Sequence, residues 1–261
     1  MLLALITVVC GACGSSPSNP IAPTSSHSIA PALSNARTSG EGPQGEIRWE
    51  YTGETWQPSS PPPPCAAPLT LPTPVDVSKV TSILYPGQTR GGDYKPHGGF
   101  RFDSPNQGND VPVSAPLDAV IIRGARYLVN GEIQYTFDFV NPCGIMYRLG
   151  HLRELSSRFQ LLADTFPPAS ETDSRTTNVD PGQAVTSGEV VATAIGIRAN
   201  GNVFVDWGVY DLRAPNASGR SGELEGFAVC WLDHLVPASA AIARALPPAD
   251  PQSGKTSDYC R

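Results

Sequence analysis

The chain has 261 residues, of which 40% are hydrophobic and only 16% are charged. Its 25 glycines and 27 prolines argue against an all-helical bundle and favour a turn-rich β protein, because both residues interrupt helices. The formal net charge of −6 at pH 7 argues against a nucleic-acid partner, since such binding depends on a basic surface.

The N-terminus has the pattern of a targeting signal. Residues 1–9 are apolar and are followed by Cys10-Gly11-Ala12-Cys13, and a short apolar run that ends in small residues is typical of secretory signals. Residues 1–13 resemble the signal peptide of bacterial lipoproteins, which implies lipidation of Cys13. We therefore expect a lipid-anchored, extracytoplasmic protein of the cell envelope, at the outer membrane or periplasmic face of a two-membrane cell. A plain secreted protein and a cytosolic chain are the alternatives.

The next segment has the composition of a tether. Residues 14–74 are rich in Ser and Pro, and such a composition buries too little apolar surface to offset the entropy of ordering. Within it, residues 46–56 carry enough aromatic side chains to pack as an edge strand. Thirteen of the 27 prolines precede residue 75, so a folded domain is predicted over 75–261.

The remaining cysteines predict disulfides. Two of the six cysteines lie in the N-terminal signal, and an even number in an oxidising compartment indicates two bridges. The spacing is too wide for a Cys-x-x-Cys zinc or redox site, and the spacing leaves all three pairings open. The four candidates are Cys65, Cys143, Cys230 and Cys260.

The body of the chain predicts strands. Runs of β-branched and aromatic residues bounded by turn residues indicate strands at 80–84, 99–103, 119–122, 133–140, 145–151, 189–195 and 203–210. Asn130-Gly131 predicts a hairpin turn. Apolar periodicity predicts helices over 153–164 and 238–246, and residues 170–181 form a polar segment that predicts a loop. We therefore expect a mostly β core with two short peripheral helices.

Two histidines lie in patterns that suggest a site. His97 precedes a predicted strand, and the two-residue period of a strand places it on one face with Gly99, Arg101 and Asp103. His151 ends the sequence Arg-Leu-Gly-His of another predicted strand.

Four blocks over residues 80–212 resemble the lysostaphin-type zinc metallo-endopeptidases, which cleave peptide cross-links of bacterial peptidoglycan. The blocks are 97–101, 112–120, 149–152 and 182–191. The resemblance implies an antiparallel core of the duplicated hybrid motif, of the barrel-sandwich hybrid type. The last helix would then belong to a C-terminal extension of that domain.

The family's zinc ligands are only partly present. The resemblance implies that His97 is a ligand and that His151 is a catalytic histidine. Arg101 stands where the family has a ligand Asp, and Phe204-Val-Asp206 stands where it has His-x-His. Hydrolytic zinc needs three protein ligands and an open position, and the permanent charge of Arg101 repels a divalent cation.

Several hypotheses follow. In the first, the domain has lost zinc and catalysis, Arg101 pairs with Asp206 across the former site, and the protein binds peptidoglycan or a wall-hydrolase partner without a cofactor. In the second, His97, Asp206 and Asp103 rebuild a zinc site and His151 serves catalysis in an active endopeptidase. A third is a hybrid-barrel adaptor of an envelope assembly. The last is a β domain unrelated to this family.

Overall fold

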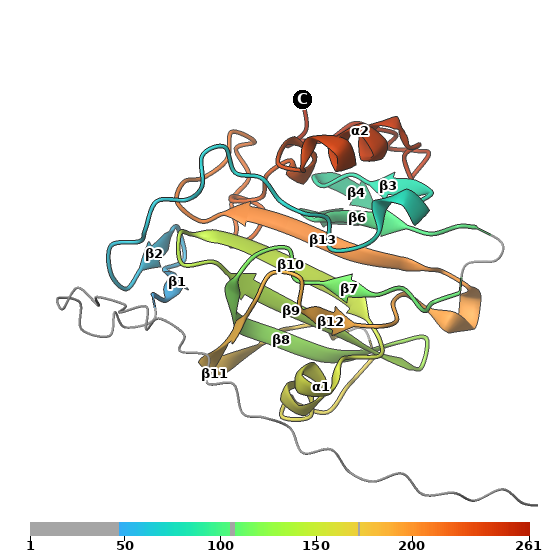
Figure 1. The fold of residues 1–261 in the computed structure, drawn as a ribbon, viewed down its shortest axis with the longest axis horizontal. Helices are drawn as coiled ribbons and strands as arrows, with labels where there is room; N and C mark the ends of the chain where they lie inside the picture. The colour runs from blue at the N-terminus through green and yellow to red at the C-terminus, as the bar shows by residue number, and fades with distance from the viewer. Residues whose placement is uncertain (1–46, 105–107, 172) are drawn as a thin grey trace, which may run out of the picture. The chain divides into compact units, whose positions relative to one another are not determined.

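Seven strands form one antiparallel sheet in the order β11-β8-β9-β10-β13-β6-β3 (Figure 1). Its edge strands are β11 and β3. The strands are β3 (Ser82–Leu84), β6 (Gly98–Arg101), β8 (Ala119–Val129), β9 (Glu132–Val140), β10 (Ile145–Leu152), β11 (Thr177–Val185) and β13 (Phe204–Asp211).

The computed structural model describes residues 47–104, 108–171 and 173–261. Within these residues three further strand pairs form, namely β1 (Trp49–Tyr51) with β2 (Trp56–Pro58), β4 (Gln88–Arg90) with β5 (Asp93–Lys95), and β7 (Val113–Ser114) with β12 (Val190–Ala192). The predicted lipidation site Cys13 and the predicted tether up to residue 46 lie outside the described residues.

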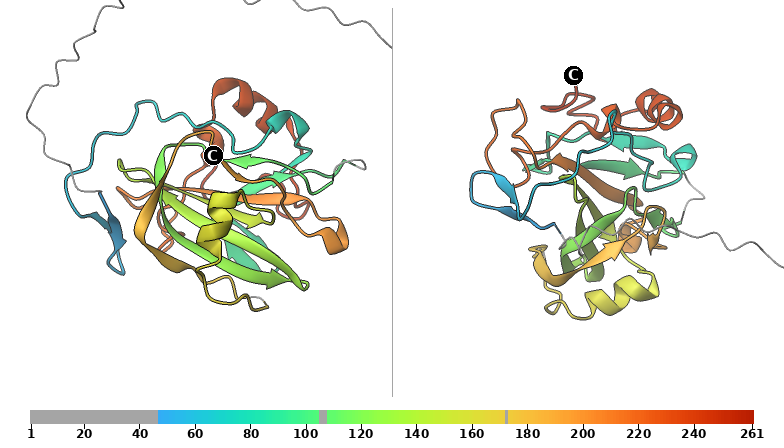
Figure 2. Two further views of the ribbon diagram at one scale, coloured as in Figure 1. Left: turned by 60° about the horizontal axis from the view of Figure 1, so that its bottom comes forward. Right: turned by 60° about the vertical axis from the view of Figure 1, so that its left-hand side comes forward.

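The described helices are short and peripheral, and the predicted mostly β fold is confirmed. The α-helices are α1 (Ser157–Ala163) and α2 (Pro237–Ala245), and single 3-10 turns occur at Val77–Lys79, Arg198–Asn200 and Trp231–Asp233. In Figure 1, α1 lies beyond β8 and α2 lies beyond β3, and Figure 2 shows both from two further sides. No helix of the described residues is long and apolar enough to cross a membrane.

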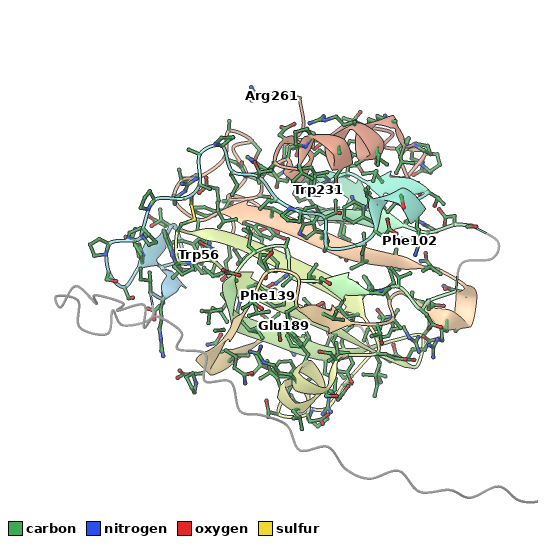
Figure 3. The ribbon with its side chains drawn as sticks, viewed as in Figure 1. Trp56, Phe102, Phe139, Glu189, Trp231 and Arg261 are labelled. Carbon is green, nitrogen blue, oxygen red and sulfur yellow. A yellow bond between two sulfur atoms is a disulfide. The ribbon has the colours of Figure 1, made fainter. Side chains whose placement is uncertain are left out.

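The two faces of the sheet differ in chemistry because side chains alternate along each strand. One face is the apolar core, in which Phe139 (labelled in Figure 3) stacks on Tyr147 with ring centroids 4.6 Å apart. Phe159 of α1 packs edge-on against Phe137 of that core. The opposite face carries a polar row, in which Arg148 of β10 lies opposite Asp138 of β9. The candidate site lies on this polar face.

Two predicted boundaries need correction. Residues 46–56 do not supply an edge strand to the main sheet, because β1 pairs only with β2 in a separate hairpin. Trp49 and Trp56 of that hairpin are buried, and they belong to a hydrophobic cluster with Met146 of β10 and Tyr210 of β13. The predicted loop at 170–181 is also wrong in part, since Thr177 begins β11, whose register against β8 shifts between Asn178 and Gln183.

The predicted disulfides are confirmed, and their pairing is now defined. Cys65 is bonded to Cys143, and Cys230 is bonded to Cys260. The first bridge holds the segment before β3 against the sheet, and the second fixes the C-terminal tail to the chain that precedes α2.

Candidate functional site

Asp206 lies at the centre of the polar face. On β13 it lies opposite Gly150 of β10 and Gly99 of β6. A Cβ atom on Gly150 would lie 3.4 Å from the Asp206 Cβ, so this glycine keeps the space beside the carboxylate free. Cross-strand neighbours share a face, and the two glycines therefore leave the carboxylate open to side chains that approach from either strand.

Two histidines face this carboxylate. His97 Nε2 lies 3.1 Å from Asp206 Oδ2, and His151 Nε2 lies 3.4 Å from the same oxygen. All three side chains are largely buried, with exposed fractions of 15–21%. The structure therefore brings together His97, His151 and Asp206, which the sequence analysis had selected from three separate segments of the chain.

His151 reaches the polar face through an irregularity in β10. The register of β10 against β9 shifts between Leu149 and Leu152, and His151 has a positive φ of 57°. A β-bulge redirects a side chain in this way. The imidazole is then held on its other side, where Nδ1 lies 2.5 Å from Gln134 Oε1, and it packs against Phe204 with ring centroids 4.2 Å apart.

Charge at the site follows from burial and from these contacts. Burial opposes the charge on Asp206, but the two imidazoles hold the pKa of this carboxyl well below its usual range. Burial lowers the pKa of the His151 imidazole, and the negative charge of Asp206 offsets this effect only in part. At neutral pH the cluster therefore contains an ionised Asp206 and a neutral His151.

The predicted pairing of Arg101 with Asp206 is wrong. The Arg101 guanidinium instead bonds to Asp103, with Nη2 2.8 Å from Oδ1. Asp103 also accepts from the hydroxyls of Thr81 and Ser82. In the register of β6 and β13, Arg101 lies opposite Phe204, so Asp206 is two residues further along β13 and is not the direct cross-strand neighbour of Arg101.

The zinc that the resemblance implies does not fit these residues. Among the described residues, no group of three or more His, Cys, Asp or Glu side chains is arranged to hold a metal ion. Asp103, the predicted additional ligand, is committed to Arg101, Thr81 and Ser82. The ring of Phe204, at the position of a family histidine, offers no donor atom.

His97, His151 and Asp206 line a groove on the polar face, with a volume of about 800 Å³. Its charged lining consists of four basic and two acidic side chains, in addition to the histidines, although the chain as a whole is acidic. These side chains are Arg90, Lys95, Arg101, Arg148, Asp206 and Asp250. Three of the basic side chains are paired with carboxylates outside the lining, namely Lys95 with Asp93, Arg101 with Asp103 and Arg148 with Asp138. Arg90 has no such partner among the described residues, so it is the basic side chain of the groove that is available to an anionic ligand.

A buried ion cluster next to the groove was missed by the sequence analysis. Asp138 is fully buried and is bonded by Arg148, whose Nε lies 2.6 Å from Oδ1, and by Arg123. Burial opposes ionisation of Asp138, but the two arginines keep its pKa below the usual value. The sequence does not show that Arg123, Asp138 and Arg148 are neighbours, because their proximity depends on the register of β8, β9 and β10.

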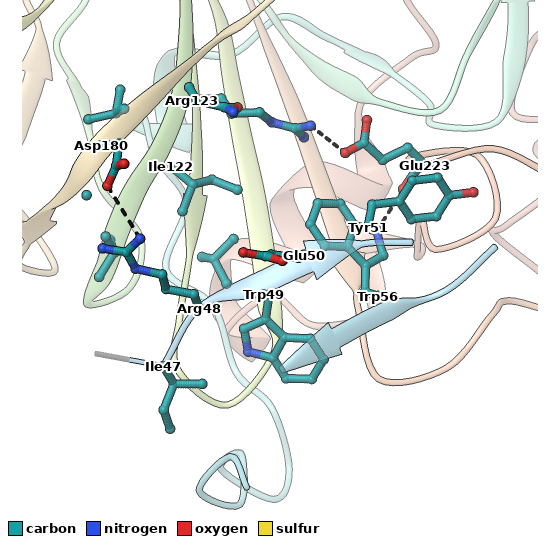
Figure 4. Close-up of a pocket in the computed structure, with 15 residues that line it drawn as sticks. Ile47, Arg48, Trp49, Glu50, Tyr51, Trp56, Ile122, Arg123, Asp180 and Glu223 are labelled. Atoms are coloured by element: carbon teal, nitrogen blue, oxygen red, sulfur yellow. Dashed lines mark hydrogen bonds and ion pairs between the residues drawn. The ribbon is translucent and has the colours of Figure 1, made fainter. Parts of the chain in front are cut away.

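A second cavity lies where the β1–β2 hairpin meets β8 and β11, and its volume is about 500 Å³ (Figure 4). Figure 4 shows the two ion pairs at its rim, one between Arg48 and Asp180 and one between Arg123 and Glu223. Its arginines are therefore already neutralised by carboxylates of the chain.

Comparison of the chain with models of protein families, with curated proteins and with solved structures found no match. The interpretation of the site therefore depends on the residues and the geometry described above.

Proposed function

We propose that the chain is a cell-envelope protein that binds peptidoglycan through a metallopeptidase-like domain without zinc. The observation that carries this proposal is Arg101, which lies in the groove and is paired with Asp103. The Arg101 guanidinium, which is paired with Asp103, therefore occupies the position at which the resemblance requires a zinc-binding carboxylate. His97 and His151 remain in the groove, so the surface that would contact a peptide is kept without the metal.

Two features support an extracytoplasmic location. Both disulfides join residues within the folded unit, and disulfides persist mainly in oxidising compartments. The sequence resemblance of residues 1–13 to a lipoprotein signal adds a lipid on Cys13 as the membrane anchor. Stable anchoring takes more than one acyl chain, and lipoproteins of this kind carry several.

The groove suits a peptide that carries carboxylates. Its lining includes Arg90, which has no carboxylate partner among the described residues, and its walls come from β4, β6, β8, β9, β10, β13 and the C-terminal tail. Peptidoglycan stem peptides expose free carboxyl groups, and charge complementarity of this kind sets specificity and association rate.

Co-sedimentation with purified peptidoglycan tests the proposal. The detergent-extracted protein should pellet with the cell-wall material and should release no peptide fragments during prolonged incubation with added Zn²⁺. A variant with Arg101→Asp restores the family's residue at that position and provides a matched comparison for metal uptake.

Two outcomes would contradict the proposal. A protein that stays in the supernatant with peptidoglycan from several wall types does not bind this polymer. Zinc-dependent release of peptide fragments by the unmodified protein would favour the alternative, an active endopeptidase. That alternative has one observation in its favour, the approach of two imidazole nitrogens to one Asp206 oxygen.

A further inference from the structure

Arg90 is held in one orientation at the wall of the groove. It ends β4, and its Nη1 donates to the Tyr85 carbonyl oxygen at 2.5 Å and to Gln88 Oε1 at 3.3 Å. Its Nη2 donates to the carbonyl oxygen of His97 at 3.0 Å. A guanidinium has five N–H donors, so these bonds orient the side chain and leave donors available.

Arg90 differs from the other arginines of the groove in having no carboxylate partner among the described residues. Arg101 is paired with Asp103, and Arg148 is paired with Asp138. All three line the same groove. The three hydrogen bonds of Arg90 all go to neutral oxygens.

The two acidic side chains that share the groove with Arg90 are engaged elsewhere. Asp206 faces His97 and His151. Asp250 accepts from the Ser253 hydroxyl at 2.6 Å and from the backbone of Gln252. The positive charge of Arg90 therefore lacks a direct counter-ion within the groove.

This arrangement has an electrostatic cost. Burial lowers the pKa of the Arg90 guanidinium, and the charges of Asp206 and Asp250 offset this effect only in part. A partly buried charge is normally paired with an opposite charge, because desolvation otherwise destabilises it. An anion supplied by a ligand would complete the pairing.

We propose that Arg90 binds a free carboxylate of the peptide ligand in this groove. The inference rests on the proposed function, which supplies the polymer, and it adds the chemical group that is recognised and the residue that recognises it. Planar carboxylates match the fork of a guanidinium and bind it through charge-assisted hydrogen bonds. The bond from Arg90 to the His97 carbonyl places that carboxylate beside the histidine cluster.

The first test changes the ligand and leaves the protein intact. Binding of the detergent-extracted protein is measured on peptidoglycan that has been stripped of phosphate-containing polymers, before and after amidation of its carboxyl groups. We expect amidation to weaken binding by about 10-fold or more, as for the loss of a hydrogen bond between charged groups.

The outcomes are distinguishable. Equal binding to native and amidated peptidoglycan would overturn the carboxylate assignment and leave the proposed function standing. Loss of binding when the phosphate polymers are removed would also overturn it, because the recognised anion would then be a phosphate. Binding to none of these materials would contradict the proposed function itself, and the inference with it.

The second test changes the protein. Arg90→Gln should weaken binding to native peptidoglycan by about 10-fold and should not alter binding to the amidated material. Arg213→Gln is the matched control, because Arg213 is paired with Asp211 and does not line this groove. An equal loss in the two variants would show that general positive charge, rather than Arg90, accounts for binding.

Discussion

At the scale of single residues, Asp206 determines how the site responds to pH. The two imidazoles that face it keep its folded-state pKa below the ordinary value of 3.8. As pH falls, the unfolded chain therefore takes up this proton before the folded chain does. The contribution of Asp206 to stability is complete above about pH 4 and is lost as pH falls toward the folded-state pKa.

Burial of His151 also makes the fold less stable as pH falls. Its folded-state pKa lies below 6.5, so the unfolded chain binds the proton first and stability declines as pH falls through and below that value. The negative charge of Asp206 limits this decline because it raises the pKa of His151. Acid therefore weakens the fold in two steps, the first from His151 and the second from Asp206.

Replacing Asp206 with Asn tests this account. We expect Asp206→Asn to lower the free energy of unfolding at pH 7 by about 1–3 kcal/mol, because it removes a largely buried charged partner of two imidazoles. The decline in stability below pH 4 should become shallower, and the decline below pH 6.5 should become steeper. Urea unfolding over a pH series measures both changes.

Asp211→Asn is the matched control at the other end of the same strand. Asp211 pairs with Arg213 in a more exposed position, and such pairs contribute at most about 1 kcal/mol. A variant at Asp206 that followed the same pH curve as the Asp211 variant would show that the histidine contacts do not set the acid response.

The candidate site shows what a sequence pattern can predict about single residues. Strand periodicity predicted that His97, Gly99, Arg101 and Asp103 share one face, and His97 and Arg101 of this set line the same groove. It did not predict the partner of Arg101, because the choice between Asp103 and Asp206 depends on side-chain reach. Arg90 was not selected at all, since the sequence does not show that this charge has no carboxylate partner among the residues that the structure describes.

At the scale of elements, β6 is the strand that positions His97, and Gly98 allows its close packing. A Cβ atom on Gly98 would lie 2.1 Å from the carbonyl oxygen of Leu84 and 2.9 Å from Trp231 Nε1. Leu84 belongs to β3, which pairs with β6. The pairing of these strands therefore requires glycine at this position.

Gly98→Ala should displace β6 from β3. We expect the free energy of unfolding to fall by about 1–3 kcal/mol or more, because the nearest atom is a backbone oxygen that cannot rotate away. Gly108→Ala is the control, since a Cβ atom there would meet nothing within 4 Å. Thermal and urea unfolding compare the two variants, and similar stability in both would contradict close packing at Gly98.

The predicted elements succeeded where local signals were strong. The Asn130-Gly131 turn joins β8 to β9, with positive φ at both residues, as the hairpin signal indicated. The sequence did not predict that β1 and β2 form a separate sheet. These short strands are stabilised by burial of Trp49 and Trp56 in a cluster whose other buried residues are far away in the sequence. The start of β11 was missed because its residues are polar and its register is irregular.

At the scale of the whole folded unit, the C-terminal tail links a disulfide to the groove. Ser257 Oγ donates to the Pro86 carbonyl oxygen at 2.5 Å, and Gln88 Nε2 donates to the Thr256 carbonyl oxygen at 2.7 Å. These bonds hold the tail against the β4–β5 pair that carries Arg90. The tail residues Ala249, Asp250 and Gln252 line the groove, and Cys260 at the end of the tail is bonded to Cys230.

The two disulfides should therefore differ in their effect on binding. The Cys230–Cys260 bridge spans 30 residues and the Cys65–Cys143 bridge spans 78, which corresponds to about 3.7 and about 4.5 kcal/mol of stabilisation by loop closure. Replacing both cysteines of either bridge with serine should lower the free energy of unfolding, and loss of the bridge with the longer loop should lower it slightly more.

Only loss of the Cys230–Cys260 bridge should weaken peptidoglycan binding and expose the tail to proteases, because only that bridge holds a wall of the groove. Limited proteolysis and co-sedimentation, at a temperature where both variants remain folded, measure the difference. Equal binding by the two variants would show that the hydrogen bonds of the tail hold the groove wall without the bridge.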